Sequence, residues 1–213
     1  MILKIFSEKS KDIEKYFDKA LTELERFFGF STTEKKPILI LVNDRKTIDA
    51  LRKTKTEEWF VGWAKDGNIY VLCPENYESE SNHRYSTKEY YALIKHELCH
   101  IIAYKLCEAK DKIKPRWLWE GIAIYLSGQN KLKKPLVKFN EFTQFYDTEG
   151  KGIYYESGFA VGLLIEKFGK EKFFKLLKNL KNIKSEKEFN RYFKIIYCFE
   201  PTLKNFNELL KEK

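Results

Sequence analysis

The stretch STKEYYALIKHELCHIIAYKLC, residues 86–107, predicts a long internal helix in this 213-residue chain. It opens with Ser86 and, three residues later, Glu89, a capping box that marks the first turn of a helix. The residues that follow, to about Cys107, are apolar on nearly every side of such a helix. A helix with that pattern lies inside a protein rather than on its surface.

Two of the three histidines in the chain, His96 and His100, lie in this helix around Glu97. Residues four apart on a helix share one face, one turn above each other. Both imidazoles can therefore reach one metal ion, while the adjacent carboxylate contacts a water on that ion. The alternative is structural: the histidines pack against aromatic rings, and Glu97 pairs with a lysine.

The segments around this helix divide into strands near the start of the chain and helices after it. Asp66-Gly67 between two apolar runs indicates a hairpin turn. Strands followed by a run of helices are typical of an α+β fold. The expected strands are 37–42, 59–64 and 68–72, and the expected helices are about 9–28, 47–53, 86–107, 117–126, 155–168, 171–182, 185–198 and 201–211.

The composition favours one folded domain without a membrane segment. Hydrophobic residues make up 43% and aromatic residues 16% of the chain, enough for a substantial core. No apolar run approaches the roughly 20 residues of a membrane-spanning helix, and the apolar start meets charges too early for a signal peptide. Four cysteines without C-x-x-C spacing indicate free thiols, so we expect a cytoplasmic protein.

The net charge of +9 comes from 40 Lys and Arg against 31 Asp and Glu, and most of the excess is lysine spread along the expected helices. This pattern is typical of a solvated surface. A nucleic-acid partner is not expected, since the chain has no compact Arg-rich patch and no RNA-binding signature. Binding to DNA or RNA that weakens steeply with salt would indicate otherwise.

A third candidate metal ligand, Glu120, follows twenty residues after His100. It is a lone acid within the apolar stretch Trp117–Tyr125. Burying a carboxylate without a partner is costly, and binding a metal removes that cost. The next residues include Gly121 and Ala123, and small side chains let two helices approach closely enough for Glu120 to reach the same ion.

The combination of H-E-x-x-H at 96–100 and W-L-x-E-G-x-A at 117–123 resembles the gluzincin zinc metallopeptidases, particularly their compact peptidase MA-like members. The resemblance extends in the same order over residues 36–185. It implies a single peptidase MA-like domain over the whole chain. Such a domain has an α/β lobe with a small mixed sheet and the zinc helix (1–110), a helical lobe (111–213), and an active site in the cleft between them.

The resemblance implies a role for each residue of the motif. His96, His100 and Glu120 would hold one Zn²⁺ ion, whose charge lowers the pKa of a bound water to about 7. Glu97 would take a proton from that water as it attacks a peptide carbonyl, and would deliver it to the leaving amine. The function implied is a zinc metallopeptidase that acts on peptide or protein substrates.

Tyr155 would donate a hydrogen bond to the oxyanion of the transition state, because the stretch Tyr-Glu-Ser-Gly-Phe is similar to the one that carries the family's catalytic tyrosine. The adjacent Tyr154 is the alternative donor. For either tyrosine, a core aromatic ring with a bonded hydroxyl is the structural alternative.

By the same resemblance, Gly62, Trp63 and Ala64 form a strand along the cleft edge that would bind an extended peptide; an ordinary edge strand is the alternative. Lys65 follows, where aminopeptidases of this clan have a glutamate that grips the free amine of the substrate. We therefore expect an endopeptidase or oligopeptidase rather than an aminopeptidase. The alternative function is a catalytically silent, zinc-stabilised binding or regulatory module of the same fold, in which a side chain plugs the site.

Overall fold

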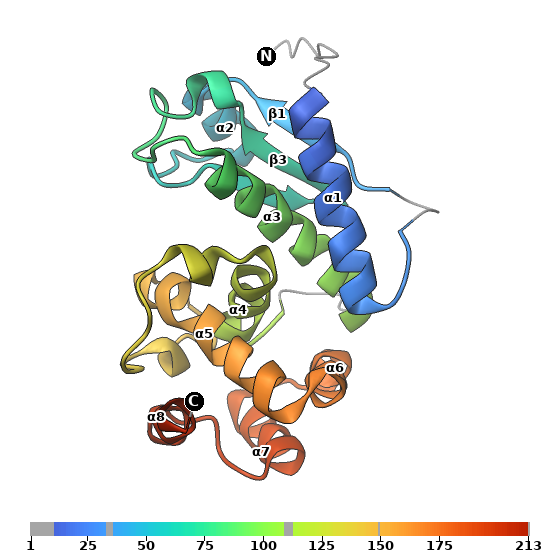
Figure 1. The fold of residues 1–213 in the computed structure, drawn as a ribbon, viewed down its shortest axis with the longest axis vertical. Helices are drawn as coiled ribbons and strands as arrows, with labels where there is room; N and C mark the ends of the chain where they lie inside the picture. Colours follow the sequence, from blue (N-terminus) through green and yellow to red (C-terminus); the bar gives the residue numbers. More distant parts are fainter. Residues whose placement is uncertain (1–10, 33–35, 109–112, 149, 213) are drawn as a thin grey trace.

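The computed structural model in Figure 1 describes residues 11–32, 36–108, 113–148 and 150–212. A small mixed three-stranded sheet lies in the N-terminal part, and the remainder is mostly helical, which confirms the expected α+β class. The strands are β1 (Leu39–Val42), β2 (Gly62–Lys65) and β3 (Asn68–Leu72). The α-helices are α1 (Lys11–Phe28), α2 (Arg45–Arg52), α3 (Thr87–Cys107), α4 (Arg116–Ser127), α5 (Lys151–Phe168), α6 (Lys170–Asn179), α7 (Glu186–Tyr197) and α8 (Leu203–Lys211), and the 3-10 helices are η2 (Pro74–Asn76), η3 (Gln129–Leu132), η4 (Phe142–Gln144) and η5 (Leu180–Asn182).

The sheet has the strand order β1-β3-β2, so β3 is central and β2 is an edge strand. β1 and β3 run parallel, whereas β2 and β3 run antiparallel with Trp63 opposite Tyr70. The β2–β3 connection turns at Asp66 and Gly67, whose φ angles are 52° and 78°. Positive φ at both central residues is the hairpin geometry that Asp-Gly favours, so the predicted hairpin is confirmed.

Helix α3 lies between the sheet, α1 and α4 (Figure 1). Its N-terminus has the predicted capping box. The backbone N–H of Glu89 donates to Ser86 Oγ at 3.2 Å, and the Ser86 hydroxyl donates to the Glu89 carboxylate at 2.9 Å. Buried residues occur along the helix from Tyr90 to Cys107, as its all-round apolar pattern predicts. The histidine-bearing helix is therefore internal, with neighbours on several sides.

Helix α5 begins at Lys151, four residues before the predicted start. The glycines at 150 and 152 favoured a loop, but Gly150 takes an extended backbone (φ −172°) as the N-cap and the helix begins directly after it. Both Tyr154 and Tyr155 therefore lie inside the helix. Successive helical side chains point about 100° apart, so these two rings cannot face the same neighbours.

Glu156 of α5 holds the irregular segment that leads to this helix. The side chain is buried, and its carboxylate accepts three backbone hydrogen bonds of 2.9–3.0 Å from consecutive residues, Asn140, Glu141 and Phe142. These bonds compensate for the burial of the acid. Glu156 thus has a structural role, because it binds the backbone of three consecutive residues.

Helices α4 and α5 pack closely because glycines lie between them. A Cβ at Gly121 would lie 2.6 Å from the carbonyl oxygen of Ser157 and 2.7 Å from Val161 Cγ2. The sequence suggested that Gly121 brings α4 toward the histidine helix; instead it faces α5. The reason is the helical rotation of about 100° per residue, which separates Gly121 from Glu120.

Replacement of Gly121 by alanine is expected to destabilise the chain, because the added methyl group meets the backbone of α5 at 2.6 Å. Overpacking of this kind costs roughly 1–3 kcal/mol, which lowers Tm by about 2–12 °C in a chain of this size. Gly162→Ala is the matched control, since its Cβ would meet only the partly exposed ring of Tyr125, at 3.0 Å. A Tm for Gly121→Ala that equals or exceeds the Tm of Gly162→Ala would contradict this packing.

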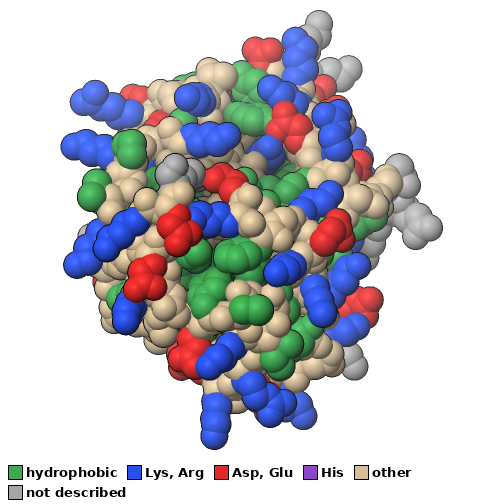
Figure 2. All heavy atoms as spheres, turned by 60° about the horizontal axis from the view of Figure 1, so that its bottom comes forward, with side chains coloured by type: hydrophobic (Ala, Val, Ile, Leu, Met, Phe, Trp, Pro, Cys, Tyr) green, Lys and Arg blue, Asp and Glu red, His purple; other side chains and the backbone are tan. Residues whose placement is uncertain are grey.

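No helix among the described residues is long and apolar enough to cross a membrane. Figure 2 shows Lys and Arg side chains spread over one face of the molecule, with Asp and Glu side chains between them. This distribution agrees with the dispersed lysines of the sequence.

Candidate metal centre and its cavity

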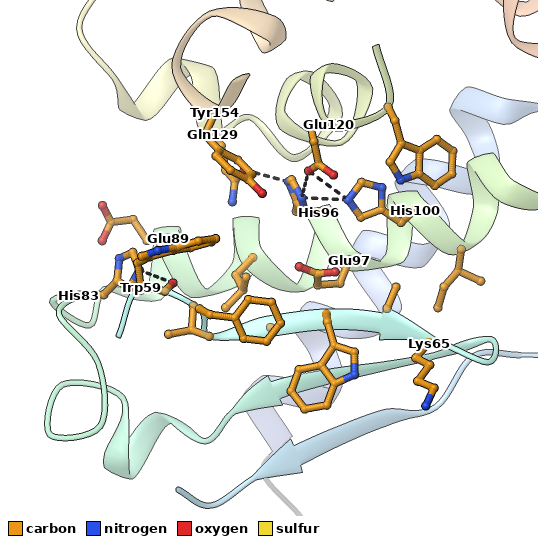
Figure 3. Close-up of a pocket in the computed structure, with 18 of the residues that line it drawn as sticks. Trp59, Lys65, His83, Glu89, His96, Glu97, His100, Glu120, Gln129 and Tyr154 are labelled. Carbon is orange, nitrogen blue, oxygen red and sulfur yellow. Dashed lines mark hydrogen bonds and ion pairs between the residues drawn. The ribbon is translucent and has the colours of Figure 1, made fainter. Parts of the chain in front are cut away.

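Three side chains from two helices converge on one point: His96 and His100 from α3, and Glu120 from α4 (Figure 3). The two histidine Nε2 atoms are 3.1 Å apart, and Glu120 Oε2 lies 3.4 Å from that of His96 and 3.5 Å from that of His100. Ligands about 2.0–2.1 Å from a tetrahedral zinc ion are separated from one another by about 3.3 Å. The three atoms have this spacing, so the group can hold a metal ion.

Neighbouring side chains orient both imidazoles. His96 Nδ1 lies 2.9 Å from Gln129 Oε1, and because an amide oxygen only accepts, Nδ1 donates its proton there. His96 Nε2 then keeps its lone pair, which is the form of imidazole that binds metals. Trp119 stacks on His100 with ring centroids 5.0 Å apart. Among the described residues, stacking orients His100, while its buried Nδ1 has no hydrogen-bond partner.

The charges of the group favour a bound cation. Burial raises the pKa of the Glu120 carboxyl, but His100 and His96 lower it by more, so the pKa lies well below its usual value. Arg116, one turn earlier on α4, donates to the other carboxylate oxygen at 3.0 Å. Burial lowers the pKa of His96, but its hydrogen bond to the Glu120 carboxylate and the charge of Glu97 raise it by more. Glu120 is therefore held ionised beside two imidazole nitrogens.

Glu97 lies between α3 and the edge strand β2 (Figure 3). Its side chain is buried, and burial raises the pKa of its carboxyl even though His96 and His100 act in the opposite direction. The backbone N–H of Ala64 donates to this carboxylate. Gly62 adjoins the same side chain, since a Cβ there would lie in ordinary contact with Glu97 Cγ, at 3.5 Å.

The register of β2 determines which backbone groups face the cavity. The N–H of Leu72 donates to the carbonyl of Val61 at 2.9 Å, so the odd-numbered residues of β2 exchange hydrogen bonds with β3. Gly62 and Ala64 direct their N–H and C=O groups outward, in agreement with the bond from Ala64 to Glu97. Gly62 and Ala64, two of the three residues of the predicted substrate strand, thus present backbone groups at the site.

The other two residues of β2 are placed differently. The side chain of Trp63 is buried and stacks on Tyr70, with ring centroids 4.7 Å apart. Lys65 is exposed at the end of the strand, away from the histidines (Figure 3). β2 therefore brings no acidic side chain to the metal-binding group that could bind a substrate amine.

These residues line a cavity of about 1030 Å³. His96, Glu97, His100 and Glu120 form part of its wall, and β2 forms another part. Exposed aromatic rings, among them Trp59, border it (Figure 3). The volume is at the upper end of the range for ligand pockets, so the metal-binding group opens onto space for a sizeable ligand.

The structure does not bring Tyr155 to this cavity. The ring is 40% exposed, contacts Phe159 on the same helix, and is absent from the cavity wall. Tyr154 lines the cavity instead, on the side of Gln129 and His96, and its ring lies 5.8 Å from that of Trp59 (Figure 3). The reason is the rotation between adjacent helical residues: with α5 in this position, only one of the two tyrosines can face the metal-binding group.

Three neighbours of the metal-binding group were not identified from the sequence. Arg116 lies four residues before Glu120, and this i,i+4 spacing is a signal that was available. Trp119 was visible only as part of the motif, without a role. Gln129 follows the Gly128 that ends α4, and nothing in the sequence indicates that its side chain turns back to His96.

Comparisons of the chain with protein families, curated proteins and solved structures returned no significant match. Functional inference therefore depends on the chemistry of the site itself.

Proposed function

We propose that this protein is a zinc-dependent peptidase of the gluzincin type, with its active site between the sheet-containing part and the helical part. The spacing of His96, His100 and Glu120 is the observation that carries the proposal: 3.1, 3.4 and 3.5 Å between three ligand atoms. A buried carboxylate, Glu97, and an open cavity adjoin them. An ion pair that served stability alone would not need a cavity of this size.

His96, His100 and Glu120 would hold the zinc ion, which would supply Lewis acidity toward a peptide carbonyl and toward the attacking water. Glu97 accepts a proton on its carboxylate from the attacking water and delivers it to the leaving nitrogen. Tyr154, rather than Tyr155, donates a hydrogen bond to the oxyanion, since Tyr154 is the one that lines the cavity.

An extended substrate lies along β2. Gly62 directs its N–H and C=O groups away from β3, and Ala64 directs its C=O group the same way, so an added strand can pair with these groups. Because the amine-binding acid of aminopeptidases is replaced by Lys65, cleavage within peptides is favoured over removal of the first residue. The open cavity beside Glu97 supports the enzyme over a silent zinc-stabilised module, which would have a side chain filling that space.

Zinc uptake and peptide turnover test this proposal together. The purified chain is expected to bind one zinc ion and to gain about 2.7 kcal/mol of stability at a free zinc concentration of 100 Kd, seen as a higher Tm. It should cleave members of a mixed peptide library, lose that activity in a chelator, and regain it when zinc is restored. Stabilisation by zinc without any cleavage would favour the binding module, and no effect of zinc would contradict both.

A further inference from the structure

Lys133 has an unusual environment for a lysine. It directly follows η3, and Gln129 at the start of η3 orients the metal-binding His96, so both ends of this short helix line the cavity. The ammonium group of Lys133 donates to the backbone carbonyl of Tyr154. The side chain is partly buried, and burial lowers the pKa of its amine to about 8.

Among the described residues, no carboxylate pairs with Lys133. Its ammonium group donates a hydrogen bond to the Tyr154 carbonyl instead. An ammonium group has three N–H donors, so two remain after that bond. A partly buried cation without a counter-ion is costly, and an anion that enters the cavity would remove this cost.

The rest of the cavity wall also carries more positive than negative charge. Five basic and two acidic side chains line the cavity in addition to Glu97, the metal-binding group and Arg116. The basic ones are Arg52, Lys65, Arg84, Lys105 and Lys133, and the acidic ones are Asp66 and Glu89. Glu89 is further occupied by the capping hydroxyl of Ser86. The excess of basic side chains in this part of the wall therefore also favours a negatively charged ligand.

We propose that the cavity selects substrates that carry a carboxylate, which pairs with the Lys133 ammonium beside Tyr154. This selectivity rests on the peptidase function proposed above and specifies its substrate class. The carboxylate belongs either to a peptide C-terminus or to an Asp or Glu side chain, and both have the same chemistry toward an ammonium group. Lys133 and Tyr154 line the same cavity as the metal-binding group, so the carboxylate and the cleaved bond occupy one cavity.

Matched peptides test the selectivity. From one cleaved sequence, four versions are made: a C-terminal carboxylate or amide, each with Glu or Gln at an internal position. The wild-type chain is expected to show a kcat/KM at least 10-fold higher for the version with the recognised carboxylate, and the pair that differs identifies its source. Lys133→Gln should bring that ratio close to one, and Lys133→Arg should largely retain it. The control is Lys134→Gln, an exposed neighbour outside the cavity wall, which should leave the ratio unchanged.

Binding separates this inference from the peptidase function. Fluorescence anisotropy with labelled acid and amide peptides on the zinc-loaded Glu97→Gln chain reports recognition without turnover. Tighter binding of the acid form, lost in a Lys133→Gln chain that melts normally, supports the inference even if no peptide is cleaved. Equal binding and equal kcat/KM for acid and amide forms, or a preference that survives Lys133→Gln, would overturn it while leaving the zinc-peptidase proposal intact.

Discussion

A Glu97→Gln chain is expected to hydrolyse peptides about 10³-fold more slowly than the wild type, since general-base catalysis contributes roughly 10²–10⁴-fold. Glutamine has the size of glutamate but cannot accept the proton. Burial already raises the pKa of the Glu97 carboxyl, which means that the folded chain disfavours its charge. Removing that charge should therefore not harm folding. Zinc affinity should change little, because Glu97 does not belong to the ligand group.

Initial rates on a cleaved peptide, measured together with zinc content, provide the test. Asp66→Asn is the matched control: it removes another carboxylate from the wall of the same cavity, and asparagine suits the φ of 52° at this turn position. The control should retain wild-type activity. Unchanged turnover in zinc-loaded Glu97→Gln would exclude Glu97 as the general base.

A Glu120→Gln chain is expected to bind zinc at least 100-fold more weakly. Even removal of a residue that only supports a ligand costs about 10–100-fold in metal affinity, and Glu120 is positioned to be a ligand itself. The amide is a poor zinc ligand, yet it keeps an oxygen that can accept the hydrogen bond from Arg116. Peptide cleavage at limiting zinc should fall with zinc occupancy.

Competition with a chromophoric chelator measures this affinity, and melting without zinc separates metal loss from misfolding. Because glutamine matches glutamate in size and can still accept the hydrogen bond from Arg116, the metal-free Glu120→Gln chain should fold, so its loss of affinity would report on the ligand alone. Unchanged zinc affinity in a folded Glu120→Gln chain would place the metal elsewhere or leave it with two protein ligands.

Much of the site could be predicted because it depends on local geometry. The positions of His96 and His100 on one face follow from the helical repeat, and the helix itself is marked by the Ser86 cap and its apolar body. Glu120 was recognisable as an acid that has no reason to lie in an apolar helix unless it has a partner. The hairpin that precedes α3 follows from Asp66-Gly67, which adopts the turn that these residues favour.

Other parts of the site required the tertiary structure. The choice between Tyr154 and Tyr155 depends on where α5 begins and how it is rotated, and one residue changes the direction of a side chain by about 100°. Gln129 reaches His96 because η3 follows α4 back toward α3, a path that no sequence period encodes. Pairing in the sheet likewise determines that Gly62 and Ala64, and not Trp63, direct their backbone groups outward.

The sequence by itself thus determined the internal helix with its two histidines, the carboxylate between them, the α+β order of elements, and the acid that completes the metal-binding group. Each of these follows from short-range spacing or from the cost of burying a charge. Only the tertiary structure decided that Tyr154 faces the cavity, that Gln129 orients His96, and that Lys133 enters the same cavity without a carboxylate partner among the described residues. These depend on helix rotation and on the paths of connecting segments, which are set by packing between residues far apart in the chain.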